Sequence, residues 1–147
     1  MTETQPYTHH IPVQLRFNDI DILGHLNNTV YFSLFDLAKA RYFAATRRGN
    51  MDWQKVECVI ANVNCAYINQ VRFGENIEIY TRCKHVGDKS FILDQLMVNV
   101  DTDEVKARCE TVMVCIDPAK GVSVPVSDYW RQCFADYENN PTLLEKK

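Results

Sequence analysis

The sequence lacks the features that mark several large classes of protein. No apolar run approaches the ~18 residues that a membrane-spanning helix requires, and residues 1–10 hold no apolar signal core. Basic residues number 16 against 19 acidic ones, so the net charge of −3 creates no general positive field for nucleic acid. We therefore expect no membrane partner, no nucleic-acid partner and a cytoplasmic location.

Glycine and proline are also scarce, at five residues each, which excludes collagen-like and low-complexity chains. The hydrophobic fraction of 46% and the charged fraction of 24% are those of a soluble globular domain. A length of 147 residues matches the ~100 to 200 residues typical of one domain. We expect a single domain over residues 1–147, with its core at about 11–126.

Recognisable cofactor and metal motifs are missing as well. The sequence contains no GxxxxGK(S/T) phosphate loop, no GxGxxG turn, no HExxH motif and no EF-hand loop. The six cysteines form no CxxC pair and have no histidine at zinc-finger spacing, so free thiols are expected. The sequence therefore predicts no cofactor and no metal ion.

Hydrophobic periodicity predicts one strand, one long helix and then four more strands. Residues 11–18 alternate apolar and polar side chains, as a half-buried strand does. Residues 29–43 carry apolar side chains over more than half of a helix circumference, so another layer must cover that helix. Runs rich in valine, isoleucine and aromatic residues predict strands at 57–68, 76–86, 90–100 and 105–116. The short turns between them favour antiparallel pairing.

A second, short helix is predicted at 127–138. Ser127 is placed to cap this helix, and Trp130, Phe134 and Tyr137 fall on one face of it. The tail from Asn139 is expected to fray. The fold class is therefore α+β, with an antiparallel sheet of about five strands wrapped around one long central helix. A sheet with an open face and open edges predicts association, at least as a dimer.

The connection between the first strand and the long helix, residues 16–28, concentrates the polar chemistry of the chain. Asn27 or Asn28 can cap the helix, whose first N–H groups carry the positive end of the helix dipole. Asp21 lies in the loop before them. A carboxylate opposite N–H donors supplies a base or nucleophile and an oxyanion site, which hydrolysis of an activated acyl group requires. Asp21 and the N–H of Asn28 are the candidates.

The same loop resembles the signature of hotdog-fold acyl-CoA thioesterases of the 4-hydroxybenzoyl-CoA thioesterase type. The spacing is DxDxxGHxNNxxY, and the matching residues are Asp19, Asp21, Gly24, His25, Asn27, Asn28 and Tyr31. The similarity extends over about residues 11–126, including 67–75 and the turn at 87–90, although Gln70-Val71 stands where the family often has proline. The resemblance implies a hotdog fold, in which dimers join edge to edge with the active site at the interface.

Carried over by position, the resemblance implies that Asp21 is the general base or nucleophile. It implies that the N–H of Asn28 is the oxyanion donor. Gly24 and His25 belong to the same catalytic loop, where His25 either hydrogen-bonds the loop or assists proton transfer. Asn27 is expected to position the loop or to touch the thioester.

Substrate contacts are expected outside the catalytic loop as well. Tyr31, one turn into the helix, is either a core residue or part of the acyl pocket. Ser90 is placed to contact the pantetheine arm, although serines at strand starts usually have no special role. A basic patch for the phosphates of coenzyme A would use four side chains that are otherwise simply solvated. These are Arg72, Arg82, Lys84 and Lys89.

Neighbouring polar residues have alternative explanations. Asp19 is expected to bond nearby backbone N–H groups rather than to act as a second acid. Arg16 is expected to be solvated rather than paired with a loop aspartate. Asp19, Asp21 and His25 could instead be metal ligands, but no fourth ligand follows at a recognisable spacing.

These observations predict a thioesterase that hydrolyses an acyl-CoA, or an acyl carrier protein thioester, to free acid and thiol. Two alternatives stay open: a hotdog hydratase or dehydratase that uses Asp21 with His25, and a non-catalytic acyl-CoA-binding module. The sequence does not decide the acyl chain, the carrier or the choice between nucleophile and base. It predicts a homodimer or a homotetramer.

Overall fold

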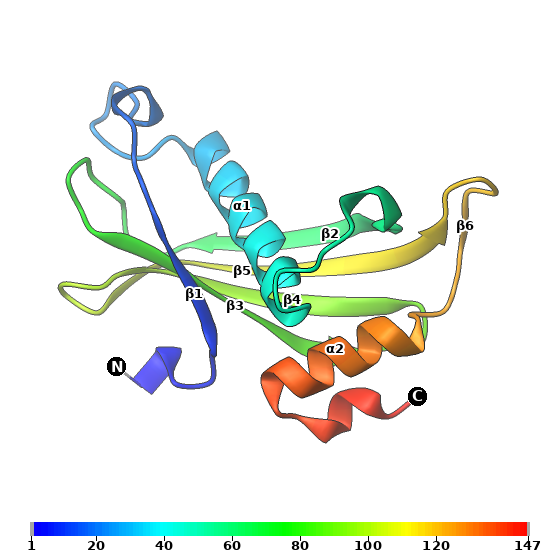
Figure 1. The fold of residues 1–147 in the computed structure, drawn as a ribbon. Helices are drawn as coiled ribbons and strands as arrows, with labels where there is room; N and C mark the ends of the chain where they lie inside the picture. The colour runs from blue at the N-terminus through cyan, green and yellow to red at the C-terminus, as the bar shows by residue number, and fades with distance from the viewer. Residues whose placement is uncertain (1, 147) are drawn as a thin grey trace.

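The computed structural model describes residues 2–146 and arranges them as a curved antiparallel sheet with a long helix lying across it (Figure 1). The strands are β1 (His9–Val13), β2 (Cys58–Tyr67), β3 (Ile77–Val86), β4 (Ser90–Asn99), β5 (Glu104–Asp117) and β6 (Val122–Ser123). The helices are α1 (Asn28–Thr46) and α2 (Asp128–Glu138), with short 3-10 helices η1 (Thr2–Thr4), η2 (Phe17–Asp19), η3 (Trp53–Lys55) and η4 (Pro141–Leu144). Within residues 2–146, no helix is both long enough and apolar enough to cross a membrane.

The strands follow the order β1-β3-β4-β5-β2, with β6 paired to β5, and every pair is antiparallel. The meander of β3, β4 and β5 confirms the expectation from their short turns. For β2 and β3 the expectation is wrong, because β2 pairs with β5 and lies at the far end of the order from β3. The four long strands lie within two residues of their predicted bounds. Among these strands, β1 and β2 lie at the two ends of the order, so β2 leaves one long edge of the sheet open.

Helix α1 packs one apolar stripe against the sheet. Phe35, Ala38 and Tyr42 are fully buried, at 0% exposure. The half of α1 before Ala38 shares a core cluster with Val71 and the start of β3, and the half after it shares a core cluster with α2. Apolar side chains outside this stripe are exposed, because Phe32 is 40% exposed and Leu37 44%. The sheet therefore covers one side of α1 only. The expectation that a second layer covers all of its apolar surface is wrong for the single chain.

Strand β1 is shorter than its alternating pattern predicts, and the prediction of a strand over 11–18 is wrong in its bounds. Its pairing with β3 ends at Val13, opposite Ile77, because β3 begins there. Beyond this point the chain has no strand partner and turns into η2. Phe17, which the alternation placed on the buried side, is 82% exposed.

Helix α2 begins where the sequence places it, because the Ser127 hydroxyl accepts a hydrogen bond from the backbone N–H of Trp130 at 3.1 Å. The expectation of a frayed tail after Asn139 is wrong. Asn139 turns the chain with a φ of 50°, η4 follows, and Leu143 is only 3% exposed. The buried guanidinium of Arg131 donates to the carbonyl oxygen of Leu143 at 3.3 Å, which fixes the tail against α2.

All six cysteines are unpaired, as the sequence predicts. Cys83, Cys109 and Cys115 are buried and the others are half-buried. Burial raises the pKa of the Cys65 thiol to about 11. The buried thiols of Cys83, Cys109 and Cys115 therefore pack as small apolar core groups.

Truncation of the buried tail residue tests this packing. Leu143→Ala is expected to lower the free energy of unfolding by about 2 to 5 kcal/mol, because it opens a cavity between η4 and α2. Leu144→Ala, at a neighbouring position that is 38% exposed, is the matched control and is expected to change it by less than about 0.5 kcal/mol. Urea unfolding measures both variants, and equal effects would contradict the packed tail.

Candidate active site

The loop between η2 and α1 closes on itself as a small hairpin. Ile20 and Leu26 form an isolated antiparallel bridge, and the backbone N–H of Asp21 donates to the carbonyl oxygen of His25 at 2.9 Å. Gly24 turns the chain with a φ of 80°, a conformation that side chains other than glycine rarely adopt. The loop therefore has a defined shape that holds Asp21 just before the helix.

One oxygen of the Asp21 carboxylate is held by the loop itself. Oδ1 accepts hydrogen bonds from the backbone N–H of Leu23 at 2.9 Å and, more weakly, of His25 at 3.5 Å. Oδ2 has no hydrogen-bond partner among residues 2–146. The arrangement orients the carboxylate and leaves its second oxygen available.

The first turn of α1 leaves one backbone donor open. Asn27 is the cap, and its Oδ1 accepts from the backbone N–H of Thr29 at 3.0 Å, while the N–H of Val30 donates to the Asn27 carbonyl at 2.9 Å. The N–H of Asn28 has no acceptor within the described part of the chain. The backbone N–H of Asn28 is therefore the donor at this helix start that remains available to a ligand.

A second loop anchors this junction. The backbone N–H of Leu26 donates to the carbonyl oxygen of Val71 at 2.7 Å, which ties the loop before α1 to the connection between β2 and β3. Figure 1 shows the two connections side by side at the same end of the molecule. Arg72 is exposed and directly follows Val71 in the chain. Of the four cations predicted to bind phosphate, it therefore lies nearest to the loop before α1.

Asp19 has the structural role that the sequence predicts. It is 3% exposed, and its carboxylate accepts from the backbone N–H of Arg16 at 2.8 Å and from Nη2 of the same residue at 2.9 Å. These hydrogen bonds hold the pKa of Asp19 below its ordinary value. The preferred interpretation of Arg16 as unpaired is therefore wrong, although its side chain is 77% exposed.

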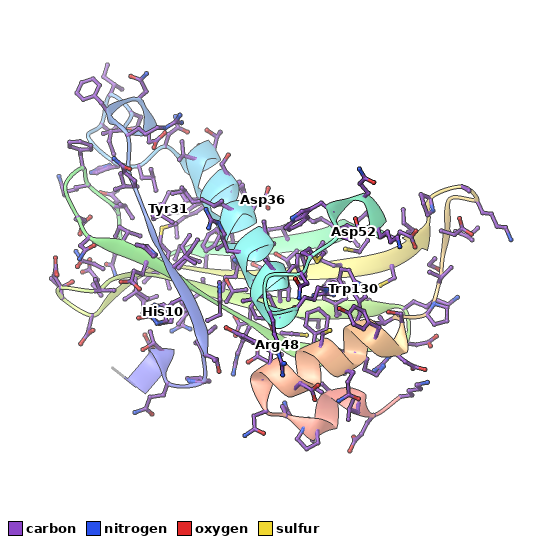
Figure 2. The ribbon with its side chains drawn as sticks, viewed as in Figure 1. His10, Tyr31, Asp36, Arg48, Asp52 and Trp130 are labelled. Atoms are coloured by element: carbon purple, nitrogen blue, oxygen red, sulfur yellow. The ribbon has the colours of Figure 1, made fainter. Side chains whose placement is uncertain are left out.

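Tyr31 lies near the N-terminal end of α1 (Figure 2) and is 3% exposed. Its ring meets the ring of Tyr67 edge to face, with centroids 4.9 Å apart. Burial raises the pKa of Tyr31, so its hydroxyl is neutral at physiological pH. Tyr67, on the open strand β2, is 48% exposed. Sequence reasoning missed Tyr67 because its contact with Tyr31 joins residues far apart in the chain.

Two of the predicted phosphate-binding cations lie elsewhere. Arg82 and Lys84 are on β3 at positions that alternate with its buried residues, so they face away from α1. Arg82 pairs with Asp94 at 3.1 Å, and Lys84 pairs with Glu110 at 2.5 Å. Within one chain they do not join the loop that carries Asp21.

Lys89 lies in the turn between β3 and β4, and Ser90 is the first residue of β4, at the end of the sheet that meets α2. The backbone N–H of Gly87 donates to the carbonyl oxygen of Ser90 at 2.7 Å, and Arg131 of α2 donates to the carbonyl of Gly87 at 2.6 Å. This end is opposite to the loop that carries Asp21. A single chain therefore does not assemble the expected basic patch.

Comparisons with known proteins confirm the resemblance seen in the sequence. The family model of the thioesterase-like superfamily matches residues 15–134. The protein YsmA of Bacillus subtilis (strain 168) is 30% identical over 116 residues, which cover 79% of this chain and 78% of that protein. The long-chain acyl-CoA thioesterase FadM of Escherichia coli (strain K12) is 24% identical over 108 residues, which cover 71% of this chain and 80% of that protein.

A solved structure extends the comparison to the fold. A thioesterase of Thermus thermophilus, complexed with coenzyme A and Zn, aligns with a TM-score of 0.82 at 27% identity, covering 93% of this chain and 98% of that one. In residues 2–146 here, no three or more His, Cys, Asp or Glu side chains form a group that could hold a metal ion. We therefore assign no zinc ligands, and Asp19, Asp21 and His25 do not fit the metal-site alternative.

The curled antiparallel sheet around α1 is the architecture of the solved thioesterases that the chain resembles. Residues 19–31, which form the loop before α1 and its first turn, carry the spacing that first indicated this relationship. With most of its length matched by the family model, the chain belongs to the thioesterase-like superfamily and has the hotdog fold.

Proposed function

We propose that this protein hydrolyses acyl-CoA thioesters to free acid and coenzyme A, with Asp21 and the N–H of Asn28 as its reacting groups. The observation that carries the proposal is the junction of loop and helix. There a carboxylate with one free oxygen precedes a helix whose first N–H is also free. The names of FadM, an acyl-CoA thioesterase, and of the coenzyme A complex from Thermus thermophilus support the substrate class.

In the proposed mechanism the thioester carbonyl oxygen accepts a hydrogen bond from the N–H of Asn28. The positive end of the α1 dipole stabilises the negative charge that develops on this oxygen, and such a donor is worth about 10² to 10³ in kcat. Asp21 Oδ2 either attacks the carbonyl carbon or takes a proton from an attacking water. The C–S bond breaks, the thiolate leaves and is protonated, and one water is consumed for each acid released.

The remaining loop residues support these two groups. Gly24 permits the turn that lets the N–H groups of Leu23 and His25 fix Asp21. The ring of His25 makes no hydrogen bond to other residues in 2–146, so we propose it as the group that protonates the departing thiolate. Asn27 acts by holding the helix start rather than by touching the thioester.

Removal of the Asp21 charge tests the mechanism directly. Asp21→Asn is expected to lower the rate of free-thiol release from short, long or aromatic acyl-CoA substrates by at least ~10², while substrate binding is retained. Asp101→Asn, in an exposed turn, is the matched control and keeps the wild-type rate. Thiol release is followed by a colorimetric assay and binding by calorimetry.

The other outcomes of this assay separate the alternatives. Acyl-CoA binding without thiol release by the wild type would replace hydrolysis with a non-catalytic binding module. Addition of water to an unsaturated acyl group without thiol release would identify a hydratase. Thiol release from acyl carrier protein thioesters, but not from acyl-CoA, would identify acyl carrier protein rather than coenzyme A as the carrier of the acyl group.

The role of the helix start is tested through the two helix caps. Asn27→Ala and Ser127→Ala each remove one side-chain cap, and each is expected to cost about 1 kcal/mol of stability. Only Asn27→Ala is expected to reduce kcat, by about tenfold or more, because it loosens the turn that presents the N–H of Asn28. Equal kcat values in the two variants would contradict the role of the Asn28 N–H as the oxyanion donor.

We propose a second copy of the chain as the partner that completes the site. Large apolar side chains are exposed on the open edge strand β2, at Ile60 and Tyr67, and Phe32 of α1 is exposed as well. An exposed apolar edge strand favours pairing with another strand. Antiparallel pairing of β2 with the β2 of the second copy would cover this surface with a two-fold interface.

The proposed dimer is tested by a charge at its centre. Ile60→Asp is expected to convert a wild-type dimer to monomers, because it places a carboxylate at the apolar edge. Val122→Asp, on β6, is the control, since Val122 is 50% exposed and Ile60 is 45% exposed. Sedimentation velocity measures the mass of each protein. A monomeric wild type, or a dimer that Ile60→Asp leaves intact, would contradict pairing through β2.

A further inference from the structure

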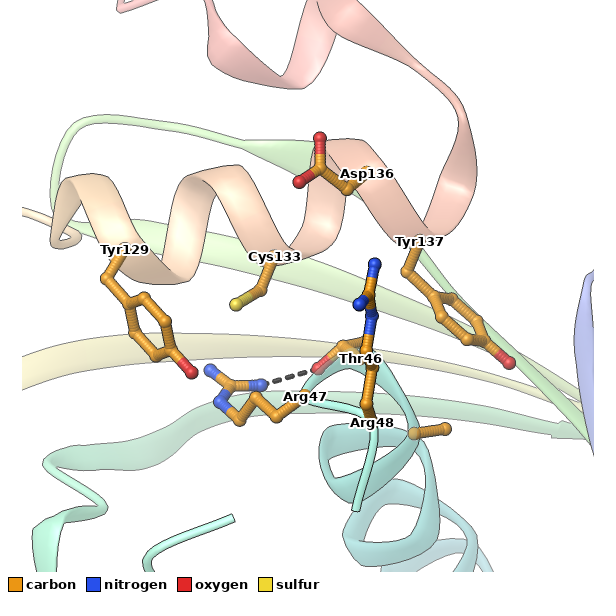
Figure 3. A pocket seen from close by; sticks show the side chains of 8 residues that line it. Thr46, Arg47, Arg48, Tyr129, Cys133, Asp136 and Tyr137 are labelled. Carbon is orange, nitrogen blue, oxygen red and sulfur yellow. Dashed lines mark hydrogen bonds between the residues drawn. The ribbon is translucent and has the colours of Figure 1, made fainter. Parts of the chain in front are cut away.

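A cavity of about 440 Å³ lies between the C-terminal end of α1 and helix α2 (Figure 3), and we call it the α1–α2 cavity. Since α1 has 19 residues, this cavity is about 28 Å along the helix from the candidate active-site loop of the same chain. Its volume is in the range of small-molecule sites. The polar and aromatic residues of its lining include Thr46, Arg47, Arg48, Tyr129, Asp136 and Tyr137.

Arg47 brings a buried positive charge to the α1–α2 cavity. It is 6% exposed, and its guanidinium carbon lies 4.1 Å from the centroid of the Trp130 ring. Nη1 donates to Thr46 Oγ1 at 2.5 Å and to the carbonyl oxygen of Phe43 at 3.2 Å. Nη2 has no hydrogen-bond partner among the residues described. Stacking on Trp130 does not satisfy Nη2, because its N–H bonds lie in the guanidinium plane.

Arg48 brings a second guanidinium to the same cavity. Its φ of 54° and the φ of 85° at Gly49 turn the chain sharply after α1, and the Arg48 side chain then runs toward Asp136 (Figure 3). The left-handed conformation is unfavourable for arginine. No ion pair within 4.0 Å joins Arg48 to an acidic residue in the described part of the chain. The acid on this wall, Asp136, accepts instead from Gln132 at 2.7 Å.

The lining therefore has two cations against one carboxylate, with aromatic rings on either side. Guanidinium groups bind phosphate oxygens through paired hydrogen bonds. Tyr129 and Tyr137 of α2 offer ring surfaces and hydroxyl groups, and Asp136 can accept from hydroxyl or amino groups. Inorganic phosphate alone would leave most of the cavity empty.

We propose that the α1–α2 cavity binds a phosphate-bearing molecule of nucleotide size, with its phosphate on Arg47 and Arg48. Tyr129 lies over the guanidinium of Arg47 in Figure 3 and is 60% exposed, so its side chain can rotate away as the ligand enters. The phosphate then supplies the acceptor that Nη2 lacks. The ligand is either a free nucleotide or the nucleotide end of a coenzyme A molecule, and the second source rests on the acyl-CoA function proposed above.

Calorimetric titration tests the proposal with ADP, coenzyme A and inorganic phosphate as probes. ADP or coenzyme A is expected to bind the wild-type protein saturably. Arg48→Gln is expected to weaken that binding by at least about tenfold, because a charge-assisted hydrogen bond is worth such a factor. Arg41→Gln, an exposed arginine of α1 that does not line the cavity, is the matched control and leaves the affinity unchanged.

Arg47 requires a gentler change, because it also packs against Trp130. Arg47→Lys keeps the charge but removes the paired donors, and it is also expected to weaken binding. Competition identifies the source of the nucleotide: displacement of ADP by coenzyme A indicates the substrate's own nucleotide, and simultaneous binding indicates a separate ligand. No saturable binding of ADP or coenzyme A, binding that Arg48→Gln leaves unchanged, or phosphate binding as tight as that of the nucleotide would overturn the proposal.

Discussion

The packing of α1 across the sheet is the constraint on which the rest of this molecule depends. Phe35 and Tyr42 have no exposed surface, and burial of such aromatic side chains dominates the energetics of a core this size. Once these residues are fixed, the axis of the helix is fixed, and so are the places of its two ends. The loop with Asp21 lies at one end and the cavity beside α2 lies at the other.

The two ends of α1 have opposite chemistry because the backbone groups of a helix all point one way. At the start, Asn27 caps the N–H of Thr29 and leaves the N–H of Asn28 free to face an anion. At the end, Nη1 of Arg47 and the backbone N–H groups of the cap occupy the last carbonyl oxygens. The cation that completes this C-terminal cap retains an unused donor in Nη2.

Most of the fold was predictable from sequence because the periods of two and 3.6 residues reveal which face of each element is buried. The motif likewise pointed to Asp21, Asn27 and Asn28 through the spacing of its residues. What failed depends on contacts between distant segments. The alternation past Val13 does not reveal that β3 begins opposite it, and the short tail does not reveal that Leu143 fills a gap beside α2. The same limit hid Tyr67 beside Tyr31.

In the proposed dimer, substrate binding and assembly depend on the same open side of the chain. The ring of Tyr67 contacts buried Tyr31 and yet lies on β2, the strand proposed to pair with a second copy. An acyl group bound beside Tyr31, which is one of the two roles that the sequence leaves open for this residue, would then lie against the proposed interface. A change in that interface would alter both the affinity for the acyl group and association. The antiparallel arrangement would also bring the C-terminal half of one α1 alongside the N-terminal half of the other. In that geometry, the two ends that lie far apart in one chain approach each other across the pair.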